Sequence, residues 1–265
     1  MEFKDKVVWI TGASSGIGEG LVYAFAEMGC KLVISARREH ELLRVKEQTK
    51  LTDENILVLP IDLEQYTLAK NWVNLVVAKF GQIDILINNG GVSQKGLTME
   101  TDLSVEKKIM DINYFGNVAL SKAVIPIMQN QKSGKIVITT SILGKFGLPL
   151  HSTYAASKHA LYGFYDSLRM ELKTDNIKIL IVSPGFINTQ ASVNALKEDG
   201  KRLEKNSPAQ INGMKTNVFA QKLISAIKSD KKHVYIGNKE LLSVPFKLLF
   251  PNLFYKIMVK LNKGK

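Results

Sequence analysis

Short apolar runs rich in β-branched residues recur along the chain and constrain its fold more than any other feature. Between them, apolar residues at three- and four-residue spacing predict amphipathic helices, as at Trp72, Val76 and Phe80. A helix between two strands returns the chain to the starting edge of a sheet, so the strands run parallel. The pattern predicts an α/β doubly wound sandwich with about seven parallel strands and helices on both faces. The predicted strands are residues 7–10, 32–35, 56–61, 83–87, 135–140, 177–182 and 233–236.

The chain has 265 residues, 45% of them hydrophobic, and shows no repeat or linker that would divide it. We expect one domain over residues 1–265, with a substrate lid at about 190–214. No apolar run of about 18 residues and no signal-peptide pattern is found, which predicts a cytoplasmic protein. A single cysteine, Cys30, excludes an internal disulfide, and its apolar neighbours predict that it is buried.

The net charge of +12 is concentrated in the last quarter of the chain. Residues 197–265 hold 15 Lys and Arg against 5 Asp and Glu, a difference of +10. This surplus is interpreted either as a solvated surface or as attraction to anionic lipid, an acidic partner or a phosphorylated ligand. The segment at about 240–265 mixes lysines with large apolar residues, which indicates packing or a subunit contact first and a peripheral membrane contact second. Pro245 and Pro251 exclude a single spanning helix there.

A glycine-rich turn, Thr-Gly-Ala-Ser-Ser-Gly-Ile-Gly at residues 11–18, follows the first predicted strand and opens a helix. At this place a parallel sheet binds a dinucleotide, because glycines let the backbone approach a pyrophosphate and the helix N-terminus offers N–H groups. The turn makes the predicted sandwich Rossmann-type. The predicted cofactor contacts in it are Gly12, Ser14, Ser15, Gly16, Ile17 and Gly18.

The end of the second predicted strand reads Ser-Ala-Arg-Arg at residues 35–38, where an NAD-binding protein would carry an acidic residue. A guanidinium can hold a 2′-phosphate with two hydrogen bonds, so the sequence favours NADP(H), with Arg37 preferred over Arg38 as the contact. Asp62, followed by Leu63, is interpreted either as an acceptor for the adenine amino group or as a helix cap. The small-residue turn at 88–91 allows close approach of the cofactor, although an Asx turn explains it equally well.

Tyr154 and Lys158 stand four residues apart in a segment with a helical pattern, so their side chains share one helical face. A free phenol has a pKa of about 10. A neighbouring ammonium favours phenolate and is expected to lower that pKa, which would make the tyrosine a usable proton shuttle. Alone, such a pair is a weak signal, because chance pairs on helices are frequent.

Together these motifs resemble the short-chain dehydrogenase/reductase family over roughly residues 5–190, most closely the branch with the dehydrogenase/reductase member 7 enzymes and the 11β-hydroxysteroid dehydrogenases. The chain departs from the usual family pattern in having Gly90 and Gly91 after the Asn-Asn pair. The residues that carry the resemblance are the glycine turn, Asn88, Asn89, Gly90, Asn113, Ser141, Tyr154, Lys158, Pro184 and Gly185.

The resemblance implies roles for these residues. Tyr154 would be the general acid or base, Ser141 would bond the substrate oxygen, and Asn113 would hold a water of the proton relay. Lys158 would bind the nicotinamide ribose. Further cofactor contacts implied by the resemblance are Leu63, Asn89, Gly90, Pro184, Gly185, Ile187 and Thr189.

The expected protein is an NADP(H)-dependent oxidoreductase that interconverts a carbonyl and a secondary alcohol on a steroid-, retinoid- or ketone-like apolar molecule, without a metal, as a homodimer or homotetramer. A 3-oxoacyl-carrier-protein reductase is the enzymatic alternative. A nonenzymatic NADP(H)-binding redox sensor is the alternative from another class. Nucleic acid is not an expected partner, because no aromatic-lined basic groove or known motif is present.

Overall fold

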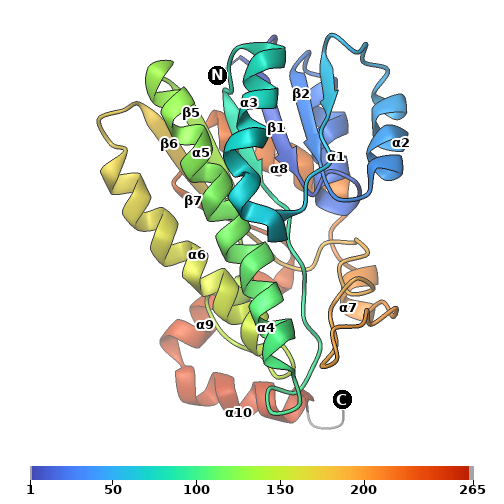
Figure 1. The fold of residues 1–265 in the computed structure, drawn as a ribbon. Helices are drawn as coiled ribbons and strands as arrows, with labels where there is room; N and C mark the ends of the chain where they lie inside the picture. Colours follow the sequence, from blue (N-terminus) through green and yellow to red (C-terminus); the bar gives the residue numbers. More distant parts are fainter. Residues whose placement is uncertain (1, 263–265) are drawn as a thin grey trace.

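Seven parallel strands form one sheet in the order β3-β2-β1-β4-β5-β6-β7 in the computed structural model, which describes residues 2–262 (Figure 1). The order reverses between β1 and β4, and the carboxyl ends of strands beside such a reversal form the crevice where doubly wound sheets bind ligands. The predicted fold class is confirmed. The strands are β1 Val7–Thr11, β2 Lys31–Ser35, β3 Ile56–Val58, β4 Ile85–Asn88, β5 Gly134–Thr139, β6 Ile177–Pro184 and β7 His233–Ile236.

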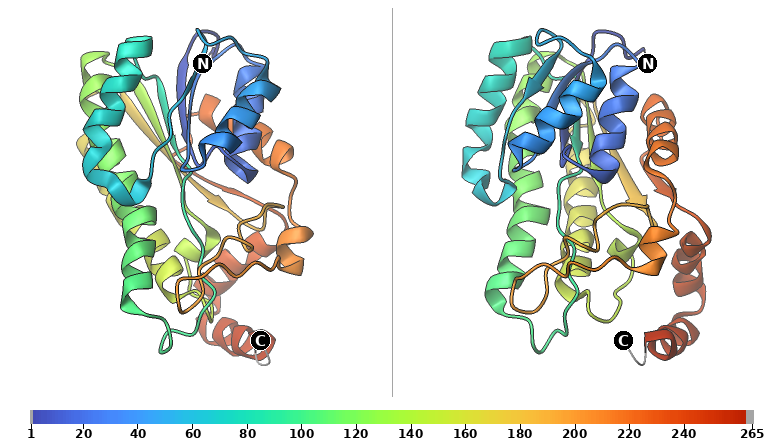
Figure 2. Two further views of the ribbon diagram at one scale, coloured as in Figure 1. Left: turned by 45° about the vertical axis from the view of Figure 1, so that its right-hand side comes forward. Right: turned by 90° about the vertical axis from the view of Figure 1, so that its right-hand side faces the viewer.

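Helices cover both faces of this sheet, as the two further views show (Figure 2). On one face lie α1 Gly16–Ala26, α2 Glu39–Thr49 and α8 Thr216–Lys228, and on the other lie α3 Ala69–Phe80, α5 Gly116–Asn130 and α6 Ser152–Glu171. Alternate residues of β1 enter the two cores: Val8 and Ile10 pack toward α1, whereas Val7 and Trp9 pack toward α3 and α5. Burial on both faces explains why the strands are almost continuously apolar.

Strand β3 ends three residues earlier than the sequence pattern predicts. Pro60 cannot donate to a ladder, although the N–H groups of Leu59 and Ile61 still bond the backbone of β2 and the residue after it. The burial predicted for Cys30 is confirmed. Its thiol donates to the Phe3 carbonyl, and burial raises the pKa of the thiol to about 12.

Between β4 and β5 the chain forms one long helical path with a defect in it. Helix α4, Leu103–Met110, continues through the π-helical turn η2, Asp111–Phe115, directly into α5. A π-turn inserts an extra residue and redirects the neighbouring side chains, and such turns are frequent at functional sites. Here the turn carries Asn113.

The remaining short elements lie around the carboxyl end of the sheet. The expected lid contains the single turn α7, Pro208–Ile211, and isolated bridges join Ile187 to Met214 and Leu196 to both Gln94 and Arg202. Three 3-10 turns complete this end: η1 Leu63–Leu68, η3 Ile142–Gly144 and η4 Lys239–Leu242.

The C-terminal segment folds into two short helices, α9 Ser243–Leu249 and α10 Pro251–Asn262. Both prolines lie in first turns, where no backbone N–H is needed. The expected break in the segment is therefore real and falls at Phe250. No helix within residues 2–262 has the length and apolarity that crossing a bilayer requires.

Candidate active site

The glycine turn is packed so closely against the next strand connection that side chains are excluded. A Cβ on Gly18 would lie 2.1 Å from the Gly12 carbonyl oxygen, and one on Gly12 would lie 2.9 Å from the Gly90 Cα. Gly12 and Gly16 also have positive φ angles of 66° and 61°. The turn is held by Thr11, whose Oγ1 accepts from the N–H groups of Asn89 and Gly90 at 3.0 and 2.9 Å. Asn89 and Gly90 thus lie directly against the turn, as their predicted role requires.

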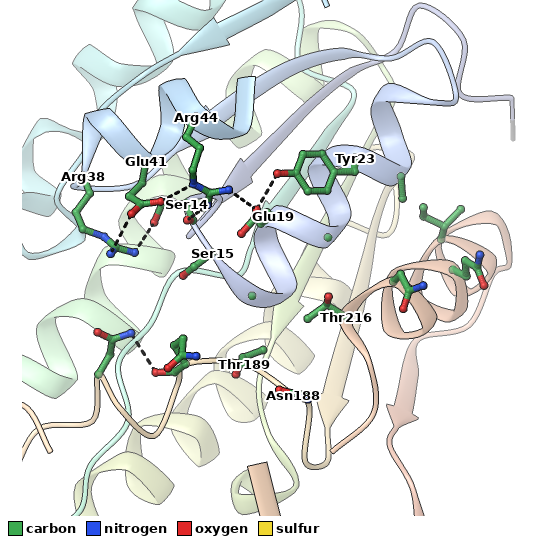
Figure 3. A pocket seen from close by; sticks show the side chains of 18 of the residues that line it. Ser14, Ser15, Glu19, Tyr23, Arg38, Glu41, Arg44, Asn188, Thr189 and Thr216 are labelled. Carbon is green, nitrogen blue, oxygen red and sulfur yellow. Dashed lines mark hydrogen bonds and ion pairs between the residues drawn. The ribbon is translucent and has the colours of Figure 1, made fainter. Parts of the chain in front are cut away.

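Helix α1 begins beside this turn and leaves its first N–H groups open. Its N-cap residue, Ser15, makes no side-chain capping bond, so the positive end of the helix faces the turn without a protein acceptor from the cap. A cavity of about 930 Å³ lies in front of it (Figure 3) and is lined by Ser14, Ser15, Gly16 and, from the opposite side, Thr189. A glycine turn that leaves no room for side chains and a helix N-terminus without a side-chain cap together fit a pyrophosphate.

The predicted arginines differ in their surroundings. Arg37 is exposed and does not line the cavity, whereas Arg38 lines it and donates from Nη2 to Ser14 Oγ at 3.4 Å. Arg38 is also 4.0 Å from Glu41. Within residues 2–262 neither guanidinium makes a close ion pair with a carboxylate, so both can bind an anionic ligand.

A third arginine, Arg44, was not singled out from the sequence. It lies between two carboxylates in Figure 3, donating to Glu19 and Glu41 at 2.8 Å each. The hydrogen bond from Arg44 holds the pKa of Glu41 below its usual range. By occupying both carboxylates, Arg44 lessens the negative potential that would otherwise face an anion beside Arg38.

Asp62 and Leu63 occupy the start of η1. Asp62 Oδ1 accepts from the Glu64 N–H at 3.1 Å, so the capping interpretation holds for that oxygen. Leu63 packs against the strand connection, because a Cβ on Gly90 would lie 2.7 Å from its Cδ1. Leu63 is therefore next to Gly90, another predicted cofactor contact, and Asp62 precedes Leu63 in the chain.

Tyr154 and Lys158 lie one turn apart near the start of α6, and Ser141 faces them from the N-cap of η3, just after β5. Lys158 is buried, with Nζ donating to the Thr139 carbonyl at 2.9 Å and lying 5.8 Å from the centre of the Tyr154 ring. The Ser141 hydroxyl interacts with the Tyr154 hydroxyl. The structure thus brings together three of the four predicted catalytic side chains directly.

The fourth, Asn113, is connected to Tyr154 indirectly, through a hydrogen bond to Ser157, and also bonds the backbone of Val92. Its Oδ1 accepts from the Val92 N–H at 2.8 Å, and its Nδ2 donates to the Val92 carbonyl at 2.9 Å and to Ser157 Oγ at 3.0 Å. Ser157 in turn donates to the Tyr154 carbonyl at 2.7 Å. The side chain of Asn113 is therefore committed to positioning the β4 connection and the turn of α6 that carries Tyr154. Gly91 makes this packing possible, since a Cβ there would lie 3.0 Å from Asn113 Oδ1.

Gln94 is a positioning residue that sequence reasoning missed. Its buried side chain accepts from the N–H groups of Thr153 and Tyr154 at 2.9 and 3.1 Å. It caps α6 from another element, while the helix's own N-cap residue, His151, makes no side-chain capping bond. No local sequence signal exists for a cap supplied from about sixty residues away.

The pKa of Tyr154 in the Tyr154 and Lys158 pair differs from the expectation. Burial raises the pKa of Tyr154, and only the interaction with Ser141 lowers it, because the Lys158 ammonium points to the Thr139 carbonyl rather than to the phenol oxygen. The predicted lowering of the tyrosine pKa by its lysine neighbour is thus wrong for the protein without its cofactor. Burial also lowers the pKa of Lys158 to about 8.

The loop after β6 is fixed by residues from later elements. Gln210 Nε2 donates to the Ile187 carbonyl at 2.6 Å and to Thr189 Oγ1 at 3.0 Å. The side chain of Ile187 is buried in the core, so only its backbone is available to a ligand, whereas Thr189 lines the cavity.

Pro184 and Gly185, which precede these residues, are held from the C-terminal segment. Glu240 Oε1 accepts from the Phe186 and Asn238 N–H groups at 2.8 and 2.9 Å. A Cβ on Gly185 would lie 2.0 Å from that oxygen. The loop that carries these four predicted cofactor contacts therefore depends on Gln210 and Glu240, neither of which the motifs reveal.

The buried ammonium of Lys158 predicts a pH-dependent stability. In the unfolded chain a lysine pKa is about 10.4, so between pH 8 and that value the unfolded state binds more protons and the free energy of unfolding rises with pH. Lys158→Met should raise the free energy of unfolding at neutral pH by roughly 1 to 3 kcal/mol and flatten this rise. Urea unfolding at pH 7 and pH 10 measures both effects, with exposed Lys70→Met as the control. If the free energy of unfolding of Lys158→Met still rose with pH as in the wild type, the lowered pKa of Lys158 would not be its cause.

The chain is similar to known proteins in both sequence and fold. A model of the short chain dehydrogenase family matches residues 6–200. The chain is 44% identical over 237 residues to the dehydrogenase/reductase SDR family protein 7-like of Anopheles gambiae, spanning 88% of this chain and 75% of the relative. It is 42% identical over 250 residues to dehydrogenase/reductase SDR family member 7 of Homo sapiens, spanning 92% and 74%. A solved short chain dehydrogenase/reductase from Burkholderia phymatum in complex with NAD shares the fold with a TM-score of 0.85, at 23% identity and covering 96% of both chains.

Proposed function

Because the chain belongs to the short-chain dehydrogenase/reductase family, as an oxidoreductase of the member 7 type, we propose that it uses NADP(H) to interconvert a carbonyl group and a secondary alcohol on an apolar small molecule. The observation that carries this proposal is the convergence of Ser141, Tyr154 and Lys158 beside the carboxyl ends of β4 and β5. Two hydroxyl donors and a buried ammonium supply what carbonyl reduction needs from a protein.

A bound nicotinamide would supply the hydride in reduction or accept it in oxidation. In reduction, the Tyr154 hydroxyl donates its proton to the substrate oxygen while the Ser141 hydroxyl donates a hydrogen bond to the same oxygen. The raised pKa of Tyr154 keeps the phenol protonated at neutral pH, which suits it to act as the acid. In oxidation the same proton returns to Tyr154. Lys158, held by the Thr139 carbonyl, would bind the ribose next to the phenol.

A buried apolar cluster begins at the residue after Ser141, which supports an apolar substrate. The turn η3 begins directly after Ser141, and its Ile142 packs with Phe146 and Phe254 in a separate apolar cluster. An acyl thioester carried by an acidic protein is the alternative, favoured by the basic surplus in residues 197–265.

NADPH oxidation over a panel of ketones, quinones, steroids, retinal and acyl thioesters tests the proposal. We expect turnover with the apolar ketones and aldehydes and little with acyl thioesters. Turnover of thioesters alone would establish the alternative. Tight NADPH binding without turnover of any carbonyl compound would favour the nonenzymatic redox sensor.

NADP(H) preference is proposed to rest on Arg37 and Arg38. Arg37→Gln and Arg38→Gln should each raise the KM for NADPH by about tenfold, a loss of ~1.4 kcal/mol, and leave the KM for NADH nearly unchanged, because only NADPH carries the 2′-phosphate. Steady-state kinetics with both cofactors measures the two ratios, with exposed Lys70→Gln as a control of equal charge change. An unchanged ratio in both arginine variants would remove the pair from cofactor selection.

A further inference from the structure

Four large apolar side chains lie exposed at the corner where α9 meets α10. We call Leu248, Leu249, Phe250 and Leu253 the corner patch; their exposed fractions are 79%, 68%, 55% and 50%. Soluble monomeric proteins seldom leave several adjacent large apolar side chains this exposed unless something else covers them.

The corner patch is held outward by a buried anchor. Phe254 is fully buried and stacks edge-on against Phe146 at 5.0 Å between ring centres, within the cluster that includes Ile142. Phe254 is buried whereas Leu253, the residue before it in α10, is half exposed, so turning the patch inward would extract Phe254 from its cluster. The exposure is therefore built into the fold.

The charged side chains that α9 and α10 themselves carry are all positive. Lys247, Lys256 and Lys260 lie on α9 and α10, and the sequence has no Asp or Glu between residues 241 and 262. Lysines next to exposed leucine and phenylalanine are typical of surfaces that lie on anionic membranes, where the aliphatic stems stay with the apolar layer and the ammonium groups reach phosphates.

A second exposed apolar group lies at the same end of the molecule. The loop that precedes α4 and the first residue of that helix hold Leu97, Met99 and Leu103, which are 49%, 95% and 81% exposed. Figures 1 and 2, which are turned about one vertical axis, show this loop and α10 at the same height, at the end opposite the N-terminus. Two groups at one height can reach a flat surface together.

We propose that this end of the protein docks on an anionic lipid bilayer, with the corner patch in the interfacial layer and the three lysines at the lipid phosphates. A second copy of the chain fits the patch less well. In a two-fold contact the same lysines would face one another with no acidic residue of this segment to pair them, and lysine is depleted in protein interfaces. The docking does not depend on the reaction proposed for the active site.

Co-sedimentation of the full chain with unilamellar vesicles tests the proposal. Vesicles of phosphatidylcholine with phosphatidylserine should bind the protein, vesicles of phosphatidylcholine alone should bind it several-fold less, and added salt should weaken the binding. Wild-type protein that fails to sediment with the anionic vesicles at low salt would overturn the proposal.

Matched double variants locate the binding surface. Leu248→Glu with Leu249→Glu should lower the partition coefficient by about tenfold or more, because it removes two apolar side chains and adds two negative charges. Leu75→Glu with Met170→Glu makes the same charge change at exposed positions on α3 and α6 and should reduce binding far less. Circular dichroism checks that both variants fold. Equal losses in the two variants would show that net charge alone drives binding, and a corner variant that turns a dimer into a monomer in size-exclusion chromatography while vesicle binding persists would assign the patch to a second copy; either result overturns the proposal.

Discussion

Tyr154→Phe is expected to lower kcat by roughly 10³-fold while the affinity for NADPH stays within a few-fold of wild type. The substitution removes the proton donor and one of the two hydroxyls that stabilise charge on the substrate oxygen. The ring remains, and so do the bonds of Gln94 and Ser157 that hold this turn of α6, since both engage the Tyr154 backbone. Steady-state turnover and the quenching of protein fluorescence by NADPH measure the two quantities separately.

Tyr114→Phe is the matched control, because it removes a phenol hydroxyl from the π-turn without touching the side chains at the site. It should retain nearly all turnover. Wild-type turnover in Tyr154→Phe would remove the tyrosine from the chemistry, whereas loss of NADPH binding would mean that the substitution disturbs the fold of the site.

Gly18→Ala should disrupt the glycine turn. The added methyl would lie 2.1 Å from the Gly12 carbonyl oxygen and 2.9 Å from Asn89 Nδ2, and a backbone oxygen cannot move aside without shifting the whole turn. We expect a loss of about 3 kcal/mol in the free energy of unfolding, at the upper end for overpacking, and a loss of at least about tenfold in NADPH affinity. Urea unfolding and NADPH titration measure these effects.

Gly163→Ala provides the opposite case in the same protein. Gly163 lies within α6, is exposed and has no heavy atom within 4 Å of an added Cβ. Alanine should therefore stabilise the helix by about 0.5 to 1 kcal/mol. Should Gly18→Ala behave like Gly163→Ala, the turn would not be under the steric constraint described above.

The sequence alone predicts the sheet because its information is periodic and local. Apolar runs between amphipathic segments allow few arrangements other than a parallel sheet, and the glycine turn and the Tyr154 and Lys158 pair are each contained within a few residues. The residues that hold the site in place by hydrogen bonds could not be predicted in this way. Gln94, Gln210 and Glu240 act on residues about 20 to 60 positions away, and nothing in their own neighbourhood marks them. Likewise, the pKa of Tyr154 depends on where the Lys158 ammonium points, which spacing does not determine.

The carboxylate of Glu240 lies where side chains on Gly185 and Gly237 would have to stand, at 2.0 and 2.6 Å from the Cβ that each would carry. Position 185 stands about fifty residues before positions 237 and 240 in the chain, yet the three are coupled: a larger residue at either glycine would displace the Glu240 carboxylate and break its bonds to the Phe186 and Asn238 N–H groups. Covariation among the three should be visible in an alignment of relatives. Libraries built to diversify the loop after β6 will yield more folded members if they vary position 240 together with position 185.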